Sequence, residues 1–307
     1  TPQAYDNAKD FFDTGITWSN SLNVAQMLDK SSYSISLGNT HQDGIISSTG
    51  MDRYNVKVSA DTKLTNNWSS GFTANYITTS IDKAVTSGNG LLRTVYAAPP
   101  SYDLAGIPSH VDGNPYTQNS FRGSFDNAYW AMENNKFTED TNRFFGNVYA
   151  SYQTDFGTTN HKLNAKYMVG VDAYTTHYVD SYGYGSNTGG GRGQIENYGW
   201  TNATYNSLLT INYDWHINED WGLNAVVGNE IIQSNRKKYY EYGTNYNFPG
   251  WNHINNATTQ QTEEETWKNR TVGFFGNVSA SYRNMLYLTL TGRQDYVSNM
   301  PRKNRSF

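Results

Sequence analysis

The sequence contains no cysteine among its 307 residues. This absence excludes a disulfide scaffold, a thiol nucleophile and any metal site built from thiolates. Charge is also scarce, because only 16% of residues are charged and the 23 Lys and Arg nearly balance the 27 Asp and Glu without forming a basic cluster. A nucleic acid partner is therefore not expected. A continuous apolar run is missing as well, and a membrane-spanning helix needs about 20 such residues, so a helical membrane protein is excluded.

Aromatic residues, by contrast, are abundant. They make up 15% of the chain, with 25 Tyr and 8 Trp, although only 36% of residues are apolar and the mean hydropathy is −0.73. A disordered chain of this polarity would be poor in aromatics and strongly charged, so disorder is not expected. A transmembrane β-barrel is compatible with these values, because its strands alternate apolar and polar residues and keep the average hydropathy low.

Apolar and polar residues alternate with a period of two in ten segments, which indicates β-strands. In the first segment Trp18, Leu22 and Val24 share one parity, and polar residues occupy the other. No stretch has a convincing helical period, so the sequence predicts an all-β fold with about ten antiparallel strands. The ten segments are 15–24, 32–37, 54–61, 68–76, 144–152, 163–173, 209–215, 221–227, 274–282 and 286–290.

The connections between these segments alternate between short and long. Residues 65–67, 156–160, 217–220 and 283–285 read as tight turns, whereas 81–142, 180–199 and 233–269 read as long loops rich in Gly, Asn, Tyr and Trp. Short turns on one side and long loops on the other are typical of bacterial outer-membrane barrels. A propeller would repeat at a fixed period, and the spacing here is irregular.

The placement of side chains on the predicted strands favours the same interpretation. Five aromatic residues lie on the apolar parity beside short turns, where they would form a girdle at one membrane surface. They are Trp68, Tyr152, Trp215, Trp221 and Tyr282. Polar residues on the other parity would line a wet lumen. They are Asn147, Asn164, Lys166, Asp172, Asn212, Asp214, Asn224, Asn277, Arg293 and Asp295.

The residues needed for catalysis or metal binding do not form a recognisable pattern. The six His are scattered without a metal-binding spacing, and no pair of groups is placed for acid-base or nucleophilic work. Residues 189–193 (GGGRG) lie in a long loop without the strand-to-helix context of a phosphate site, and they read as a flexible loop tip. The sequence predicts neither an enzyme nor a cofactor.

Aromatic residues in the predicted long loops are the candidate ligand contacts. Aromatic rings stack on sugar rings, while Asn, Asp, Gln and Arg satisfy hydroxyl groups. The alternative for each residue is that it packs the loop itself. The candidate substrate-binding residues are Tyr116, Tyr129, Trp130, Tyr198, Trp200, Tyr246 and Trp251.

Three motifs resemble a known transporter family. Residues 5–15 (YDNAKDFFDTG) are similar to an aromatic-x-Thr-Gly block that precedes a descending strand, residues 33–45 (YSISLGNTHQDGI) to a strand followed by a Gln-x-Gly-Ile-like element, and residues 287–295 (YLTLTGRQD) to a strand ending in Arg-x-Asp. The sequence therefore resembles the SusC/RagA-type TonB-dependent outer-membrane transporters of Bacteroidetes, and most closely their starch-oligosaccharide importer.

This resemblance implies a multi-pass outer-membrane protein that imports oligosaccharides. Residues 1–307 would be an internal stretch of a 22-stranded C-terminal barrel domain, and the plug, the TonB box and the other strands would lie outside them. The implied partners are a SusD-like lipoprotein lid and TonB-ExbB-ExbD acting through the plug, and a homodimer of the transporter-lid complex is compatible with the family. Two alternatives remain open, which are a plug-less porin and a soluble all-β carbohydrate-binding or adhesin module.

Overall fold

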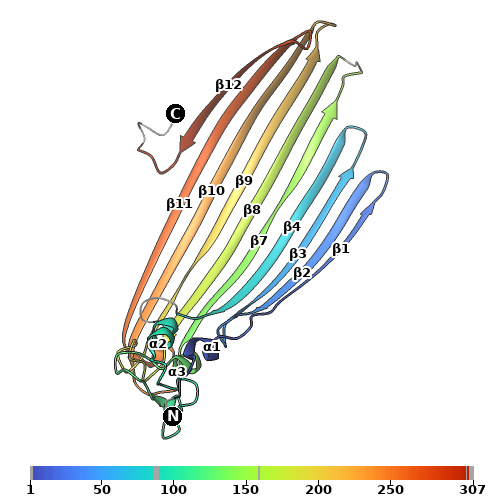
Figure 1. Cartoon of the computed structure of the whole chain (residues 1–307). Helices are drawn as coiled ribbons and strands as arrows, with labels where there is room; N and C mark the ends of the chain where they lie inside the picture. Colours follow the sequence, from blue (N-terminus) through green and yellow to red (C-terminus); the bar gives the residue numbers. More distant parts are fainter. Residues whose placement is uncertain (1–2, 86–89, 158–159, 302, 304–307) are drawn as a thin grey trace.

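The computed structural model describes residues 3–85, 90–157, 160–301 and 303. Ten strands form one antiparallel sheet in the order β1-β2-β3-β4-β7-β8-β9-β10-β11-β12 (Figure 1). Strands that follow one another along the chain are therefore neighbours in this sheet. The strand bounds are β1 (Thr17–Met27), β2 (Ser31–Asp43), β3 (Gly50–Lys63), β4 (Trp68–Lys83), β7 (Lys136–Thr154), β8 (His161–Tyr182), β9 (Gln194–His216), β10 (Trp221–Tyr246), β11 (Ala257–Tyr282) and β12 (Leu286–Val297).

All ten predicted strands are present, and the predicted all-β class is confirmed. The short turns lie together at one end of the sheet, and the longer connections lie at the other end, here called the loop end (Figure 1). The loop end also carries short helices that the sequence pattern did not predict. They are α1 (Asn7–Phe11), α2 (Leu91–Ala97), α3 (Ala128–Asn134) and the 3₁₀ helix η1 (Ile254–Asn256). A separate two-stranded sheet, β5 (His110–Val111) and β6 (Asn114–Gln118), lies in the β4–β7 connection.

The limits of the predicted long loops are wrong. The strands continue well into the ranges 180–199 and 233–269, so that the actual connections are only residues 183–193 and 247–256. The reason is that polar residues occupy both faces of these strand ends, so the alternation stops although backbone pairing continues. In β10 and β11, for example, Lys237 forms an ion pair with Glu264 at 2.8 Å on the face that is apolar farther down the strands.

One face of the sheet is an exposed apolar belt. The cross-strand neighbours Leu22, Leu37, Val56, Tyr76 and Phe144 follow one another across β1, β2, β3, β4 and β7. Each of these side chains is 41–57% exposed. A continuous apolar surface of this kind needs an apolar partner, and along alternating strands that partner is lipid.

The opposite face is polar and its side chains bind one another across strands. Ser34 and Ser59 are 2.8 Å apart through their hydroxyl oxygens, and Arg143 donates to both carboxylate oxygens of Asp172 at 2.8 and 2.6 Å. Strand pairing in the ten-stranded sheet has no register shift, so the predicted lumen residues, from Asn147 to Asp295, share this face. We refer to it as the lumen face.

The predicted aromatic girdle is found beside the short turns. Trp68 lies directly opposite Tyr152 with ring centroids 5.0 Å apart, and Trp221 lies opposite Tyr282 at 4.8 Å. Trp215 stacks on His161 at 5.7 Å. Half-exposed aromatic rings at one level of the apolar face are suited to a membrane interface. Among the described residues, no helix has the length and apolar character needed to cross a bilayer.

The two-faced sheet makes a testable prediction at Val148 and Asn147, which are adjacent on β7 but lie on opposite faces. Val148→Arg places a charge in the apolar belt, and we expect it to lower the free energy of unfolding in a lipid bilayer by about 2–4 kcal/mol. Asn147→Arg places the same side chain on the lumen face and should change that free energy little. Urea titration of the barrel in lipid vesicles would measure both values, and equal losses would contradict the assignment of the faces.

Candidate functional site

A small apolar core fastens the beginning of the chain to the long β4–β7 connection at the loop end. Its buried members are Phe11, Ile46, Val95, Leu104 and Ala128. Asn7 joins the same segments through polar contacts, because its Oδ1 accepts from the backbone N–H of Leu104 and its Nδ2 donates to the carbonyl of Tyr102, both at 3.0 Å. The segment with the aromatic-x-Thr-Gly block is thus held against residues that lie about 90 positions later.

The carboxylate of Asp126 connects two separate loops. It accepts from Gln118 Nε2 at 2.7 Å, from Ser186 Oγ at 2.6 Å and from the backbone N–H of Asn187 at 2.6 Å. Asp126 is only 7% exposed. These three hydrogen bonds satisfy the buried carboxylate, and they tie the β4–β7 connection to the β8–β9 loop.

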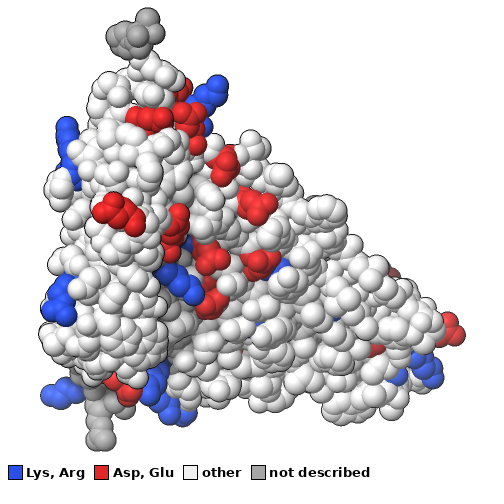
Figure 2. Space-filling model, turned by 90° about the horizontal axis from the view of Figure 1, so that it is seen from below, with Lys and Arg blue, Asp and Glu red and all other residues white. Residues whose placement is uncertain are grey.

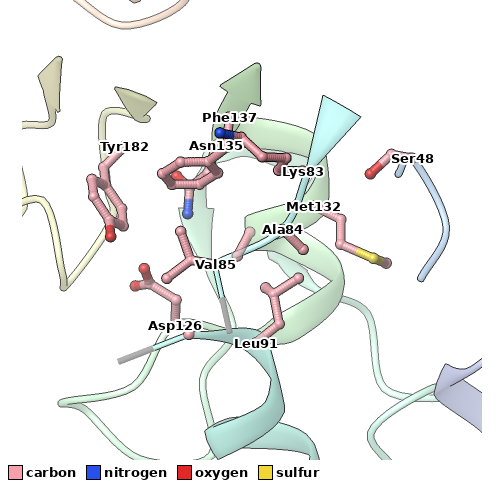
Figure 3. Close-up of a pocket in the computed structure, with 12 residues that line it drawn as sticks. Ser48, Lys83, Ala84, Val85, Leu91, Asp126, Met132, Asn135, Phe137 and Tyr182 are labelled. Carbon is pink, nitrogen blue, oxygen red and sulfur yellow. The ribbon is translucent and has the colours of Figure 1, made fainter. Parts of the chain in front are cut away.

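A cavity at the loop end has room for water but not for a larger ligand. It lies between the ends of β4 and β7 and the helices α2 and α3, where Val85, Leu91 and Met132 point toward it (Figure 3). Its volume is about 30 Å³, which is room for no more than a few waters. Larger hollows, of about 220 to 560 Å³, are open depressions on the surface of the sheet and at its turns.

Three of the predicted substrate-binding residues are packing residues of the loop end. Trp130 on α3 is fully buried, and its Nε1 donates to the carbonyl of Pro115 at 2.8 Å. Tyr246 at the end of β10 is also fully buried, with its hydroxyl 3.4 Å from Ser181 Oγ. Tyr129 on α3 donates to the carbonyl of Asp10 at 3.2 Å.

The environment of Tyr129 supports a structural role for this residue. Its ring packs edge-on against Phe11 at 5.3 Å. Burial raises the pKa of the Tyr129 phenol above its ordinary value, and the carboxylates of Asp10, Asp13 and Asp103 raise it further. The phenol therefore stays protonated and available as a hydrogen-bond donor at physiological pH.

Tyr116 and Trp251 lie close to each other in the chain fold, on β6 and in the β10–β11 loop. The Tyr116 ring lies against Gly250, and any larger side chain at position 250 would clash with the Tyr116 hydroxyl. Trp251 stacks on His253 at 4.9 Å and on Phe248 at 5.8 Å, and it remains 44% exposed. Of the predicted loop aromatics, Trp251 is the one that presents most ring surface to solvent at the rim.

Tyr198 and Trp200 lie on β9 and not in a loop, and they belong to a cluster on the lumen face. Tyr178, Tyr198 and Tyr240 are direct cross-strand neighbours on β8, β9 and β10. The rings of Tyr178 and Tyr198 stack at 4.8 Å with an angle of 6° between their planes, and Trp200 lies 5.6 Å from Tyr178. Trp267 on β11 lies on the same face, and Arg236 contacts both Trp200 and Trp267. We call this group the lumen aromatic cluster, which comprises Tyr178, Tyr198, Trp200, Tyr240 and Trp267.

Charged groups surround the lumen aromatic cluster. Lys83 lies 4.6 Å above the ring of Tyr178 and forms an ion pair with Glu139 at 3.4 Å. The Tyr198 hydroxyl donates to Asp180 at 3.0 Å. The ring faces of Tyr178 and Tyr198 pack against each other. The cluster therefore exposes mainly ring edges, hydroxyls and carboxylates to the lumen, and few open ring faces.

Sequence reasoning missed three members of this cluster, Tyr178, Tyr240 and Trp267. The sequence signal that could have found them is the alternation of the strands. If the alternation of each strand is continued past the apolar belt, all three residues fall on the lumen face. The spacing Tyr198-x-Trp200 gives the same parity on β9. Bringing these residues together requires the register of four strands, and that register is set by pairing along the whole length of the strands and not by a local pattern.

The chain is similar to known outer-membrane transporters. It is 23% identical to TonB-dependent receptor P3 of Formosa agariphila over 320 residues, which cover 99% of this chain and 30% of the receptor. Its structure matches the RagAB peptide importer in the 'closed-closed' state with a TM-score of 0.79 at 16% identity, and in the 'open-open' state with 0.80 at 15% identity. The fold is that of a TonB-dependent transporter barrel.

These matches cover 99–100% of this chain but only 34–35% of each RagAB chain, so the chain spans about a third of the proteins it resembles. No protein-family model matches the sequence. The resemblance to SusC/RagA-type transporters and the outer-membrane location are confirmed, and a soluble module is not supported. In a barrel of this fold, the apolar face of the sheet would be turned to lipid and the lumen face to the interior.

The three donors on Asp126 make a prediction for the loop end. Asp126→Asn replaces one carboxylate oxygen by an NH₂ group, which cannot accept a hydrogen bond from the donors now bound to that oxygen. We expect the free energy of local opening to fall by about 1.5–3 kcal/mol. Hydrogen exchange of residues 114–135 and 183–193 would measure this change. Asp112→Asn, at an exposed position of the same connection, is the matched control and should leave exchange unaltered. Unchanged protection in Asp126→Asn would contradict the proposed link between the two loops.

Proposed function

We propose that this chain is a wall segment of an energised outer-membrane importer of oligosaccharides. The observation that carries the proposal is the ten-stranded sheet itself, whose exposed apolar belt lies opposite a hydrogen-bonded polar face. A wall of this kind separates lipid from a wet passage, which is what an importer needs and an enzyme does not. The similarity to TonB-dependent transporters over almost the whole chain supports the same function.

The domain organisation is part of the proposal. Residues 1–307 supply about ten strands of a 22-stranded barrel domain, and the remaining strands and a plug belong to other parts of the same protein. The plug fills the lumen and receives energy from TonB-ExbB-ExbD. The proportion of the related chains that this sequence covers, about a third, is consistent with this division.

The loop end is the surface at which a substrate and a SusD-like lipoprotein lid meet the barrel. It combines the ordered β4–β7 connection with the β10–β11 loop, where Trp251 is exposed beside Phe248 and His253. Exposed aromatic rings with polar neighbours suit both sugar stacking and protein contacts.

Peptide import is a second candidate for the substrate class. One observation favours it, which is that the structural relatives are peptide importers by name. The lumen face also carries carboxylates and guanidinium groups close together, such as Arg143 with Asp172. Such pairs suit the charged ends of a peptide as well as the hydroxyls of a sugar.

Energised import predicts that uptake needs TonB. We expect a strain that depends on this transporter to lose growth on at least one oligosaccharide, or on a peptide, when either the transporter gene or the gene for TonB is deleted. A plug-less porin would lose uptake only in the first strain, because diffusion needs no energy. Growth of both deletion strains on every oligosaccharide and peptide, at the rate of the parent, would contradict nutrient import.

A further inference from the structure

Arg236 on β10 lies between two tryptophan rings on the lumen face. Its guanidinium carbon is 5.0 Å from the ring centroid of Trp200 on β9 and 5.5 Å from that of Trp267 on β11. Trp267 is the direct cross-strand neighbour of Arg236, and Trp200 is the diagonal one, beside Asn202. The strand register therefore places all three side chains next to one another on one face, and the indole rings hold the guanidinium through cation–π contacts.

The guanidinium of Arg236 keeps its donors free in the described part of the chain. Two other arginines of the lumen face are neutralised, since Arg143 pairs with Asp172 and Arg293 with Asp295 and Glu230, and Arg53 on β3 lies on this face without a Trp neighbour. Arg236 has no carboxylate within ion-pair distance among the residues that the structure describes. Cation–π contacts to the two indole rings use none of the five guanidinium N–H groups as hydrogen-bond donors to a carboxylate, so these groups are available for an acceptor from outside the protein.

The surroundings of Arg236 select against ligands with many negative charges. The neighbouring rows on the lumen face carry Glu265 opposite Lys238, Glu263 opposite Tyr240, and Glu196 opposite both Asp180 and Tyr242. Figure 2, which views the molecule from the loop end, shows acidic side chains gathered across the middle of the surface and Lys and Arg mostly toward its edges. A polyanion would be repelled by this surface, whereas a ligand with one carboxylate can place it on Arg236.

We propose that Arg236, held by Trp200 and Trp267, is a binding site for a single carboxylate on the imported ligand. This assignment rests on the proposed import function and adds the chemistry by which the lumen recognises its cargo. Arginine binds a carboxylate through two parallel N–H donors, which lysine cannot reproduce. Two sources can supply an isolated carboxylate, an acidic sugar at the end of an otherwise neutral oligosaccharide or the C-terminus of a peptide.

The test measures binding of two matched pairs of probes to the purified full-length transporter by calorimetry. One pair is a trisaccharide ending in a hexuronic acid and its neutral counterpart, and the other is a tripeptide with a free C-terminus and the same peptide as the amide. We expect Arg236→Gln to weaken binding of the carboxylate member of one pair by about tenfold or more, and to leave its neutral partner unchanged. The pair that responds identifies the source of the carboxylate.

Two further variants sharpen the result. Lys237→Gln is the matched control, because Lys237 is the next residue, lies on the opposite face and pairs with Glu264, and it should bind all four probes as the parent does. Arg236→Lys keeps the charge but loses the fork of donors, so it should recover only part of the affinity. Heat-modifiable migration on gels establishes that each variant is folded.

The outcomes separate this assignment from the import function. Equal binding of both members of each pair by the parent, or equal loss of both in Arg236→Gln, would overturn the carboxylate site. Uptake is measured in parallel in cells. If uptake requires TonB but is the same in Arg236→Gln as in the parent, the carboxylate site is overturned and the import function stands. If the parent shows no TonB-dependent uptake, the import function is overturned, and the binding result is then judged by itself.

Discussion

The continuous backbone hydrogen bonding of the ten-stranded sheet is the constraint on which the rest of the structure depends. Eight of the ten strands have a neighbour on both sides, and no register shift interrupts the pairing among them. In a bilayer every backbone N–H and C=O must be paired within the protein, because no water is present to replace a missing partner. The same uninterrupted register sends alternate side chains to opposite faces, and it thereby creates both a lipid-facing belt and a polar lumen.

The lumen face depends on this backbone pairing, whereas the loop end is held together by other contacts. On the lumen face, register alone places Tyr178, Tyr198 and Tyr240 in one row, and the stacked rings and carboxylates follow from that row. At the loop end the chain leaves the ladder, and order comes from a compact apolar core and from the buried carboxylate of Asp126. The wall is therefore rigid along its length and ends in a rim that its own side chains hold in place.

The sequence was sufficient to predict the strands, the short turns and the parity of each face, because a period of two is a local signal and Trp68 and Trp221 mark one membrane surface. It was not sufficient for the strand ends, where both faces are polar, as in residues 233–246. Helices of five to seven residues, such as α2, are too short to show a period. Trp130 is buried by segments far apart in sequence, which no local pattern reveals.

The central claim, that alternate residues of each strand face lipid and lumen, can be tested directly because this chain has no cysteine of its own. Single cysteines placed at successive positions from Phe144 to Tyr152 on β7 can carry a spin label, and electron paramagnetic resonance then measures contact with oxygen dissolved in lipid and with a paramagnetic reagent dissolved in water. We expect contact with oxygen at even positions, which face lipid, and contact with the aqueous reagent at odd positions, which face the lumen. Uniform contact with either reagent along the whole segment would contradict it.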